Sequence, residues 1–409
     1  MTAEVIVMNK ESVALAADSA VTTGNKIHES ANKLFTLRKE YPVGIMISHS
    51  SDFMGIPWET LVKIYRDHRL GDGHLERVEA YTSDFLEFIQ SEQYCTEKAQ
   101  ADQINRICWS SLNEIVSTTK ADIDSRFLQL RECSHETTNE LAREELERFR
   151  TFLQEQPDYQ YQELDRATLD DQYGNIIRDA VTDIFGSFGI RVDEDTRDLA
   201  YECVATLIFK KTPSNSHSVV SVVGFGENEI FPSYSIMHIE GVIFGELKVF
   251  SRNSADIDRH ENCVLIQPMG QSDIFNRFMY GIDDRYRNFI SIYFSEFCNK
   301  LGMPADKARQ AIDEFETRIR RNERQMFVDP IVRTVQSLPK TELASMAESL
   351  VSLTSIKRKV SDERETVAGP IDVAVITKGD GFIWLKRKHY FSPELNHHHR
   401  DLYFRRAPQ

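Results

Sequence analysis

Residues 1–27 read MTAEVIVMNKESVALAADSAVTTGNKI. Within them, residues 4–8 and 12–17 are apolar and rich in residue types that favour strands, and a short polar turn separates the two runs. This pattern predicts two neighbouring β-strands at the start of the chain. Thr2 stands directly before the first predicted strand, which would hold it in a fixed position.

Outward from this start, the chain alternates between strand and helix patterns. Strands are predicted at residues 33–38, 43–48, 217–226, 233–241, 243–250, 262–267, 371–377 and 382–387. Apolar residues recur at helical spacing from Asp52 to Arg69 and through most of residues 270–359, which predicts helices there. This order predicts an α+β fold, a sandwich of antiparallel sheets covered by helices on both sides.

A long charged stretch, residues 75–210, interrupts this order. It is rich in Glu, Arg, Gln, Leu and Phe and poor in Gly and Pro, which predicts a large, mainly helical insert with solvated faces. We therefore expect a discontinuous main domain over residues 1–74 and 211–392, with the insert between its two parts. Residues 393–409, which include three adjacent histidines, are expected to form a flexible tail.

The composition excludes several classes of protein. The 409 residues are 41% hydrophobic and 28% charged, as in a globular chain, and their net charge of −15 disfavours a general binder of nucleic acid. No apolar stretch approaches the ~18–20 residues that span a bilayer, and the N-terminus lacks the basic start of a signal peptide. The six cysteines are scattered without a CxxC pair, which favours buried thiols in the cytoplasm over disulfides or zinc.

The start of the chain also carries a candidate nucleophile. Removal of Met1 would leave Thr2 with a free α-amine beside its hydroxyl. Such an amine, with a pKa of about 8, can take the hydroxyl proton directly or through a water molecule. The residue would then hold both the nucleophile and its base.

Three elements follow Thr2 in order: Ala16-Ala17-Asp18-Ser19, Gly24-Asn25 and Lys33-Leu34. Together they resemble the start of the proteasome β-subunit and of its bacterial relative HslV, in the N-terminal-nucleophile (Ntn) hydrolase superfamily. The spacing from Thr2 to Gly24-Asn25 matches without a gap, and Lys33 requires a single deletion. The resemblance implies a four-layer αββα Ntn-hydrolase sandwich of proteasome type. In it the Lys33 ammonium lowers the pKa of the Thr2 hydroxyl, and the Asp18 carboxylate orients that ammonium.

Residues 44–53, GIMISHSSDF, resemble the strand, turn and helix start of the same family. In the family, backbone N–H groups of this turn form the oxyanion hole, which implies a site role for Ser48 and His49. The family usually has Gly-Gly here, so side chains at these positions alter the backbone or narrow the pocket. His49 is interpreted first as a helix cap or a wall of the pocket.

Later segments supply candidates for supporting groups. Residues 266–281 resemble a strand, turn and helix where the family places a serine near the amine of the nucleophile, and Ser272 or the backbone at Gly270 could serve. Residues 367–385 resemble the closing strands of the family. The acids before them are Asp362, Glu363 and Glu365.

The resemblance implies a threonine-dependent amide-bond hydrolase, namely a peptidase that self-associates into rings or related assemblies. Because members of this family often work with an ATP-driven unfoldase, the resemblance implies such a partner as well. It requires no metal or organic cofactor, and neither a nucleic acid nor a membrane is an expected partner. Two alternatives stay open. One is a catalytically inactive scaffold or assembly protein, which a covalent probe for N-terminal threonine would distinguish from an active hydrolase. The other is a small-molecule amidase, which a comparison of peptide with small-amide substrates would distinguish from a peptidase.

Overall fold

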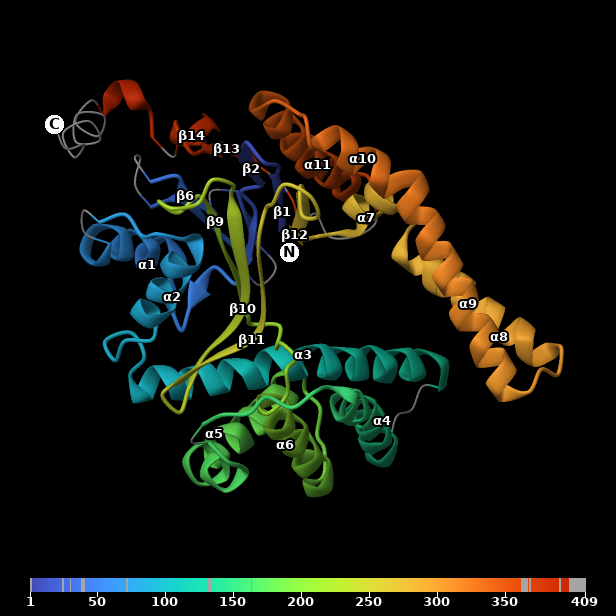
Figure 1. Cartoon of the computed structure of the whole chain (residues 1–409). Helices are drawn as coiled ribbons and strands as arrows, with labels where there is room; N and C mark the ends of the chain where they lie inside the picture. The colour runs from blue at the N-terminus through green and yellow to red at the C-terminus, as the bar shows by residue number, and fades with distance from the viewer. Residues whose placement is uncertain are drawn as a thin grey trace.

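Two five-stranded antiparallel sheets form the centre of the computed structural model of the chain (Figure 1). The structure describes residues 2–23, 26–29, 31–37, 41–70, 73–130, 134–162, 164–361, 367, 369–389 and 391–396. The first sheet has the strand order β12-β1-β2-β13-β14 and the second the order β11-β10-β9-β6-β5. The fold is therefore α+β, with antiparallel sheets, as the sequence predicts.

The strands of the first sheet are β1 (Ala3–Met8), β2 (Ser12–Ala17), β12 (Leu265–Gly270), β13 (Asp372–Thr377) and β14 (Gly381–Lys386). Those of the second are β5 (Leu34–Thr36), β6 (Val43–His49), β9 (Ser218–Gly224), β10 (Ser233–Ile243) and β11 (Glu246–Asp256). Strands β1, β2, β9 and β13 are buried along their whole length, because both faces of each sheet are covered.

A hydrophobic core lies between the two sheets. It joins Ile6 and Leu15 of the first sheet to Met46, Val219 and Ile236 of the second. On the outer face of the first sheet pack α7 (Asp273–Tyr280), α10 (Asp329–Val335) and α11 (Lys340–Lys359). On the outer face of the second pack α1 (Trp58–Ile64) and α2 (Val78–Ile89). The layers therefore run helix, sheet, sheet, helix.

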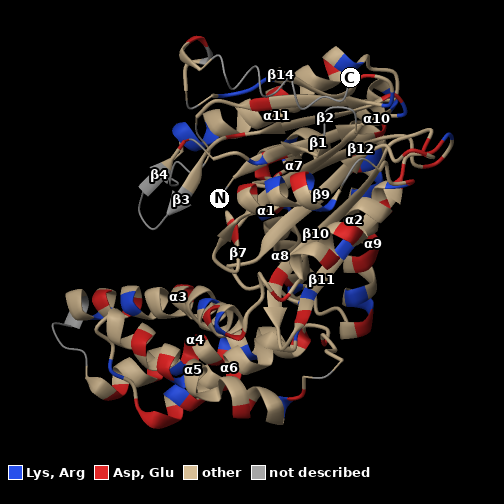
Figure 2. Cartoon of the chain, turned by 90° about the vertical axis from the view of Figure 1, so that its left-hand side faces the viewer, with Lys and Arg blue, Asp and Glu red and all other residues tan. Residues whose placement is uncertain are grey.

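A separate helical bundle lies below the sheets in Figure 1 and has its own core. It consists of α3 (Glu97–Leu130), α4 (His135–Glu155), α5 (Arg166–Ser187) and α6 (Glu194–Ile208). The β10–β11 hairpin extends down to it, and Ile243 at the end of β10 is buried in the bundle core. Figure 2 shows Lys, Arg, Asp and Glu residues spread along these helices, as expected for helix faces in contact with water.

Helix α2 falls within the predicted insert of residues 75–210 but packs on the second sheet, through Tyr81 and Phe85. The helices that share the separate core begin only at α3. The boundaries of the predicted domains remain a prediction, and the expected tail from residue 397 onward lies outside the described residues.

Two further helices, α8 (Asp284–Lys300) and α9 (Ala305–Glu323), form an arm that projects away from the sheets (Figure 1). They pair side by side, with the rings of Phe294 and Phe315 stacked at 4.3 Å. A π-helical turn, Arg324–Val328, joins α9 to α10 and so ties the arm to the layer over the first sheet.

The helix predicted from Asp52 to Arg69 is wrong at its start. Two short strands, β7 (Asp52–Phe53) and β8 (Ile56–Pro57), come first, and α1 begins at Trp58. Gly55 has a φ of +85°, which a helix does not allow. A second two-stranded pair, β3 (Val21–Thr23) and β4 (Lys26–His28), was not predicted, because its polar sequence has no apolar alternation.

Candidate active site

Thr2 lies at one end of the first sheet, directly before β1, and is only 5% exposed. Pairing of Ala3 with Gly270 fixes its position, and the N–H of Gln271 donates to the Thr2 carbonyl oxygen at 2.8 Å. Gly270 permits this close approach: a Cβ there would lie 2.2 Å from the Thr2 carbonyl oxygen and 2.8 Å from its hydroxyl. Contacts with β12 and the residue after it therefore fix the position of the start of β1.

Asp18 and Lys33 form a buried ion pair beside Thr2. Asp18 follows β2, so the antiparallel register brings it opposite Ala3, whose N–H donates to Asp18 Oδ1 at 3.0 Å. Lys33 precedes β5 of the other sheet, and its Nζ donates to Asp18 Oδ1 at 2.6 Å. Both residues are at most 4% exposed. The pair therefore bridges the two sheets at the end where Thr2 lies.

Glu4 adds a second carboxylate that the sequence-based reasoning missed. It stands two residues after Thr2 on β1, so both side chains point to the same face of the strand. Its Oε1 is 3.4 Å from Lys33 Nζ, and the residue is 1% exposed. Within the described part of the chain, neither carboxylate oxygen reaches the geometry of a full hydrogen bond. One ammonium thus faces two buried carboxylates.

Burial raises the pKa of Glu4 to about 7, and the neighbouring Asp18 carboxylate adds to the rise. The Lys33 ammonium and the hydroxyls of Thr2 and Ser48 oppose it, because they stabilise the ionised form. Near neutral pH the Glu4 carboxyl is therefore divided between its protonated and ionised forms, in contact with the candidate nucleophile.

Ser48 and His49 are the last two residues of β6, and Ser48 lies next to Thr2. The Ser48 and Thr2 hydroxyl oxygens are 3.3 Å apart, and Ser48 Oγ is 3.2 Å from His49 Nδ1. His49 has a φ of +70°, a left-handed conformation that favours glycine. The backbone at this position thus has the conformation of a glycine turn, although the residue is histidine.

His49 belongs to a row of imidazoles rather than to a helix cap. Its ring lies 4.5 Å from that of His217, which in turn lies 5.6 Å from that of His238. Although His49 keeps an exposed edge, loss of water around the ring lowers its pKa to about 4, and the neighbouring imidazoles add to this effect. At neutral pH the ring is uncharged. No helix begins at His49, so the interpretation as a helix cap is wrong.

Two of the three backbone N–H groups of residues 48–50 already have acceptors. The N–H of Ser50 donates to the His217 carbonyl oxygen at 3.2 Å, and the N–H of Ser48 points to the same strand, where Ser48 pairs with Val219. Of residues 48–50, the N–H of His49 therefore remains as a candidate for an oxyanion hole.

A cavity of about 380 Å³ lies beside Gly270. Its polar lining includes His49, His238, Gln267, Ser272 and Asn276, and its apolar lining includes Ile236, Met269, Phe275 and Tyr280. Ser272 stands at the start of α7 and faces this cavity, but no hydrogen bond joins it to Thr2 among the contacts of the described residues. Ser272 therefore lines the cavity and does not contact the candidate nucleophile through a hydrogen bond.

Several predicted residues lie outside the described part of the chain: Met1, Gly24-Asn25, Asp362, Glu363 and Glu365. Five of the six cysteines are free and buried, and Cys133 also lies outside the described residues. Over the described ranges, no cluster of three or more His, Cys, Asp or Glu could hold a metal ion. None of the helices described here is both long and apolar enough to pass through a bilayer.

No family model and no curated protein matches the chain. Among solved structures, the chain is similar to Anbu (ancestral beta-subunit) from Yersinia bercovieri, with 10% sequence identity and a TM-score of 0.29. The alignment covers 100% of this chain and 98% of that one. A likeness of this size carries no argument about fold or function.

These findings overturn the assignment to the proteasome β-subunit and HslV family. Short motifs around Thr2, Asp18 and Lys33 suggested it, but a match at such spacings does not extend along the chain. The comparison likewise gives the Ntn-hydrolase form of the sandwich no support. What remains is the geometry of the site itself, which does not depend on the name of a family.

Proposed function

We propose that the chain is an amide-bond hydrolase in which Thr2, after removal of Met1, is the nucleophile and peptides are the substrates. One observation carries the proposal. The Thr2 hydroxyl lies in contact with Ser48 and beside a buried Lys33–Asp18 ion pair that is bound to the next backbone N–H. Burial of three ionisable groups around one hydroxyl costs stability, which is typical of a functional site.

In the proposed reaction, the free α-amine of Thr2 takes the proton from Oγ1 as that oxygen forms a bond to the substrate carbonyl carbon. The negative charge on the carbonyl oxygen is stabilised by the backbone N–H of His49. The Thr2 ammonium then gives its proton to the departing amine as the C–N bond breaks. An ester on Thr2 remains, and the same amine activates a water molecule that hydrolyses it.

Lys33, Asp18 and Glu4 act in this scheme as positioning residues. The Lys33–Asp18 pair fixes the first backbone N–H of β1, and its ammonium favours an ionising hydroxyl nearby. Ionised Glu4 is the stronger acceptor for the hydroxyls of Thr2 and Ser48, whereas protonated Glu4 keeps only its weaker carbonyl acceptor. We therefore expect the site to work best when Glu4 is ionised.

The cavity beside Gly270 supports a peptide substrate. Its volume of about 380 Å³ suits one amino-acid side chain, and the cavity opens next to the residue that touches Thr2. Its mixed lining of neutral imidazole, amide and aromatic groups favours a polar or aromatic side chain over a charged one.

A peptide-hydrolysis assay with three variants tests the proposal. Thr2→Ala should abolish turnover of fluorogenic peptides, and Thr2→Ser should retain part of it, because a hydroxyl is still present. Ser50→Ala is the matched control: among the described residues its hydroxyl bonds to the backbone of Asp52 alone, and its removal should leave turnover unchanged. Equal activity of Thr2→Ala and the wild type would refute the assignment of the nucleophile.

A further inference from the structure

Helix α8 has one face packed on α9 and a bare apolar face on the other side. Toward α9, Phe294 stacks on Phe315 and Cys298 is 2% exposed. On the bare side are five large side chains: Tyr286 (59% exposed), Phe289 (59%), Ile292 (60%), Tyr293 (58%) and Phe297 (48%). We call these five residues the α8 stripe.

The α8 stripe is as large as the largest apolar patch of a typical monomer. Tyr286, Phe289 and Tyr293 form one continuous row, with neighbouring rings stacked at 6.2 and 6.3 Å. Since an aromatic side chain presents about 200 Å² and these are about half exposed, the stripe presents roughly 500 Å² of apolar area. The largest patch of a typical monomer is about 300–600 Å², and a stable interface needs about 800 Å² from each partner. The stripe therefore has the size that often marks a binding site, and it supplies more than half of the area that a stable interface needs from each partner.

We propose that the α8 stripe binds the α8 stripe of a second copy of this chain, with the two helices antiparallel around a two-fold axis that crosses the stripe at the level of residue 291. A two-fold contact requires a patch that is complementary to itself. The stripe meets this requirement, because Phe289 and Tyr293 lie at equal distances on either side of Ser291. In the antiparallel pair, Phe289 of each copy packs on the second copy's Tyr293, and Tyr286 lies near the second copy's Phe297.

The charges beside the stripe fit the same arrangement. Arg285 and Glu296 are both exposed and lie on the same edge of α8, one near each end of the stripe. Antiparallel pairing around Ser291 brings Arg285 of one copy within about one residue of the second copy's Glu296, and the symmetry repeats the contact. Parallel pairing would instead place like charges together, which is unfavourable.

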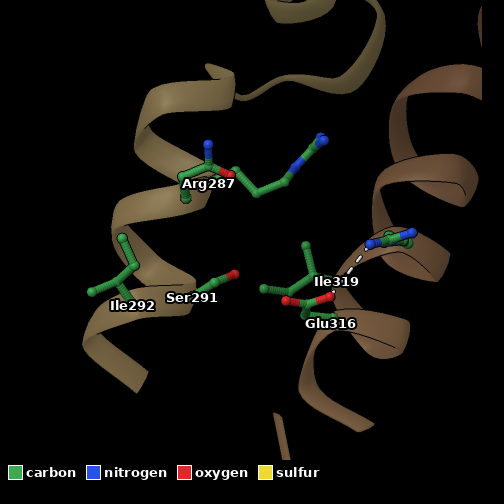
Figure 3. A pocket seen from close by; sticks show the side chains of 7 residues that line it. Arg287, Ser291, Ile292, Glu316 and Ile319 are labelled. Carbon is green, nitrogen blue, oxygen red and sulfur yellow. Dashed lines mark hydrogen bonds and ion pairs between the residues drawn. The ribbon is translucent and has the colours of Figure 1, made fainter. Parts of the chain in front are cut away.

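A cavity of about 270 Å³ lies at the same place along the helix. Figure 3 shows Arg287, Ser291 and Ile292 of α8 on one side of it and Glu316 and Ile319 of α9 on the other. Helical spacing puts Arg287 and Ser291 on the face of α8 that turns toward α9, away from Phe289 and Tyr293, so this cavity belongs to the α8–α9 contact and is not part of the proposed interface.

The chemistry of this surface disfavours the other classes of occupant. A nucleic acid or an anionic membrane would need a basic surround. Here both signs of charge flank the stripe, with Asp284 and Arg285 at its start and Glu296 and Lys300 near its end. A second copy supplies both opposite charges and the aromatic row. This inference rests on α8 and α9 and is independent of any role of Thr2.

The mass of the full chain in solution tests the proposal. Light scattering after gel filtration, between about 1 and 100 µM protein, should show a dimer or a multiple of it. The variant Phe289→Glu/Tyr293→Glu should raise the dissociation constant at this contact at least 100-fold. The control Phe127→Glu/Leu128→Glu changes two exposed apolar residues of α3 and should leave the mass unchanged. A monomeric wild type, or a Phe289→Glu/Tyr293→Glu variant that associates as the wild type does, would overturn the proposal.

A charge exchange tests the antiparallel register. Arg285→Glu and Glu296→Arg should each weaken association several-fold, and the double exchange should restore it. Arg285 and Glu296, like Phe289 and Tyr293, are on the surface. Circular dichroism and melting temperature of all these variants should therefore stay at wild-type values. Failure of the double exchange to restore association would contradict the antiparallel arrangement.

Discussion

Replacement of Glu4 by glutamine should change how the stability of the protein depends on pH. Glutamine keeps the shape of the side chain but is uncharged at every pH. In the folded protein, burial raises the pKa of Glu4 from the ordinary 4.5 to about 7. In the unfolded chain the carboxyl ionises at its ordinary value, so between pH 4.5 and 7 the folded state binds the extra proton.

The sign and size follow from this difference. Because the folded state binds more protons in that window, the free energy of unfolding of the wild type falls as the pH rises through it. A rise from 4.5 to about 7 corresponds to about 3 kcal/mol in all. Relative to the wild type, Glu4→Gln should therefore gain about 3 kcal/mol of stability between pH 4 and pH 8, with little change above pH 8.

Urea unfolding of both proteins at half-unit steps from pH 4 to pH 8.5 measures this difference. The contact with Lys33 is already part of the raised pKa, and a difference between the two proteins that is the same at every pH drops out, so the trend with pH is the quantity to compare. Glu11→Gln, on the exposed turn after β1, controls for loss of one negative charge from the same hairpin. A difference between wild type and Glu4→Gln that stays flat across the range would refute the reasoning.

Three other results are expected from the same site. The kcat/KM of the wild type for a peptide should rise with an ionisation near pH 7, and this step should disappear in Glu4→Gln, because ionised Glu4 is the form that the Thr2 hydroxyl favours; a profile that keeps the step would exclude Glu4 as its source. Lys33→Met should lower the free energy of unfolding at pH 8 by about 3–5 kcal/mol, since it leaves two carboxylates buried without a counter-charge; urea unfolding within 1 kcal/mol of the wild type would contradict this. Gly270→Ala should lower kcat/KM at least 100-fold by displacing Thr2, whereas Gly245→Ala, with a similar φ of +74° but open space around it, should affect only stability; equal kinetic effects of both variants would contradict a role for the contact with Thr2.

Most strands of the two five-stranded sheets were predictable because they are short apolar runs between polar turns. The start of the chain shows this, where β1 and β2 fall within one residue of the predicted ranges. The helix α1 was misplaced because Phe53 and Ile56 fit helical spacing by chance, whereas Gly55 takes a left-handed backbone. The spacing of apolar residues indicates which side chains are buried, but it does not indicate the backbone conformation of the residues between them.

The site was predictable only in part. Thr2, Asp18, Lys33 and Ser48 come together because the register of β1, β2, β5 and β6 carries them to the same end of the two sheets. Glu4 was missed, although one signal was available: it is a charged residue inside an otherwise apolar strand. The row of His49, His217 and His238 joins segments about 170 and 20 residues apart, which no local pattern indicates.

The central claim is that Thr2 is a working nucleophile, and one measurement tests it most directly. The intact mass and the N-terminal sequence of the purified protein would be determined before and after treatment with an epoxyketone or β-lactone that reacts with N-terminal threonine. The account predicts loss of Met1 and a single adduct on Thr2, absent from Thr2→Ala. Retained Met1, or a free Thr2 that forms no adduct, would contradict it.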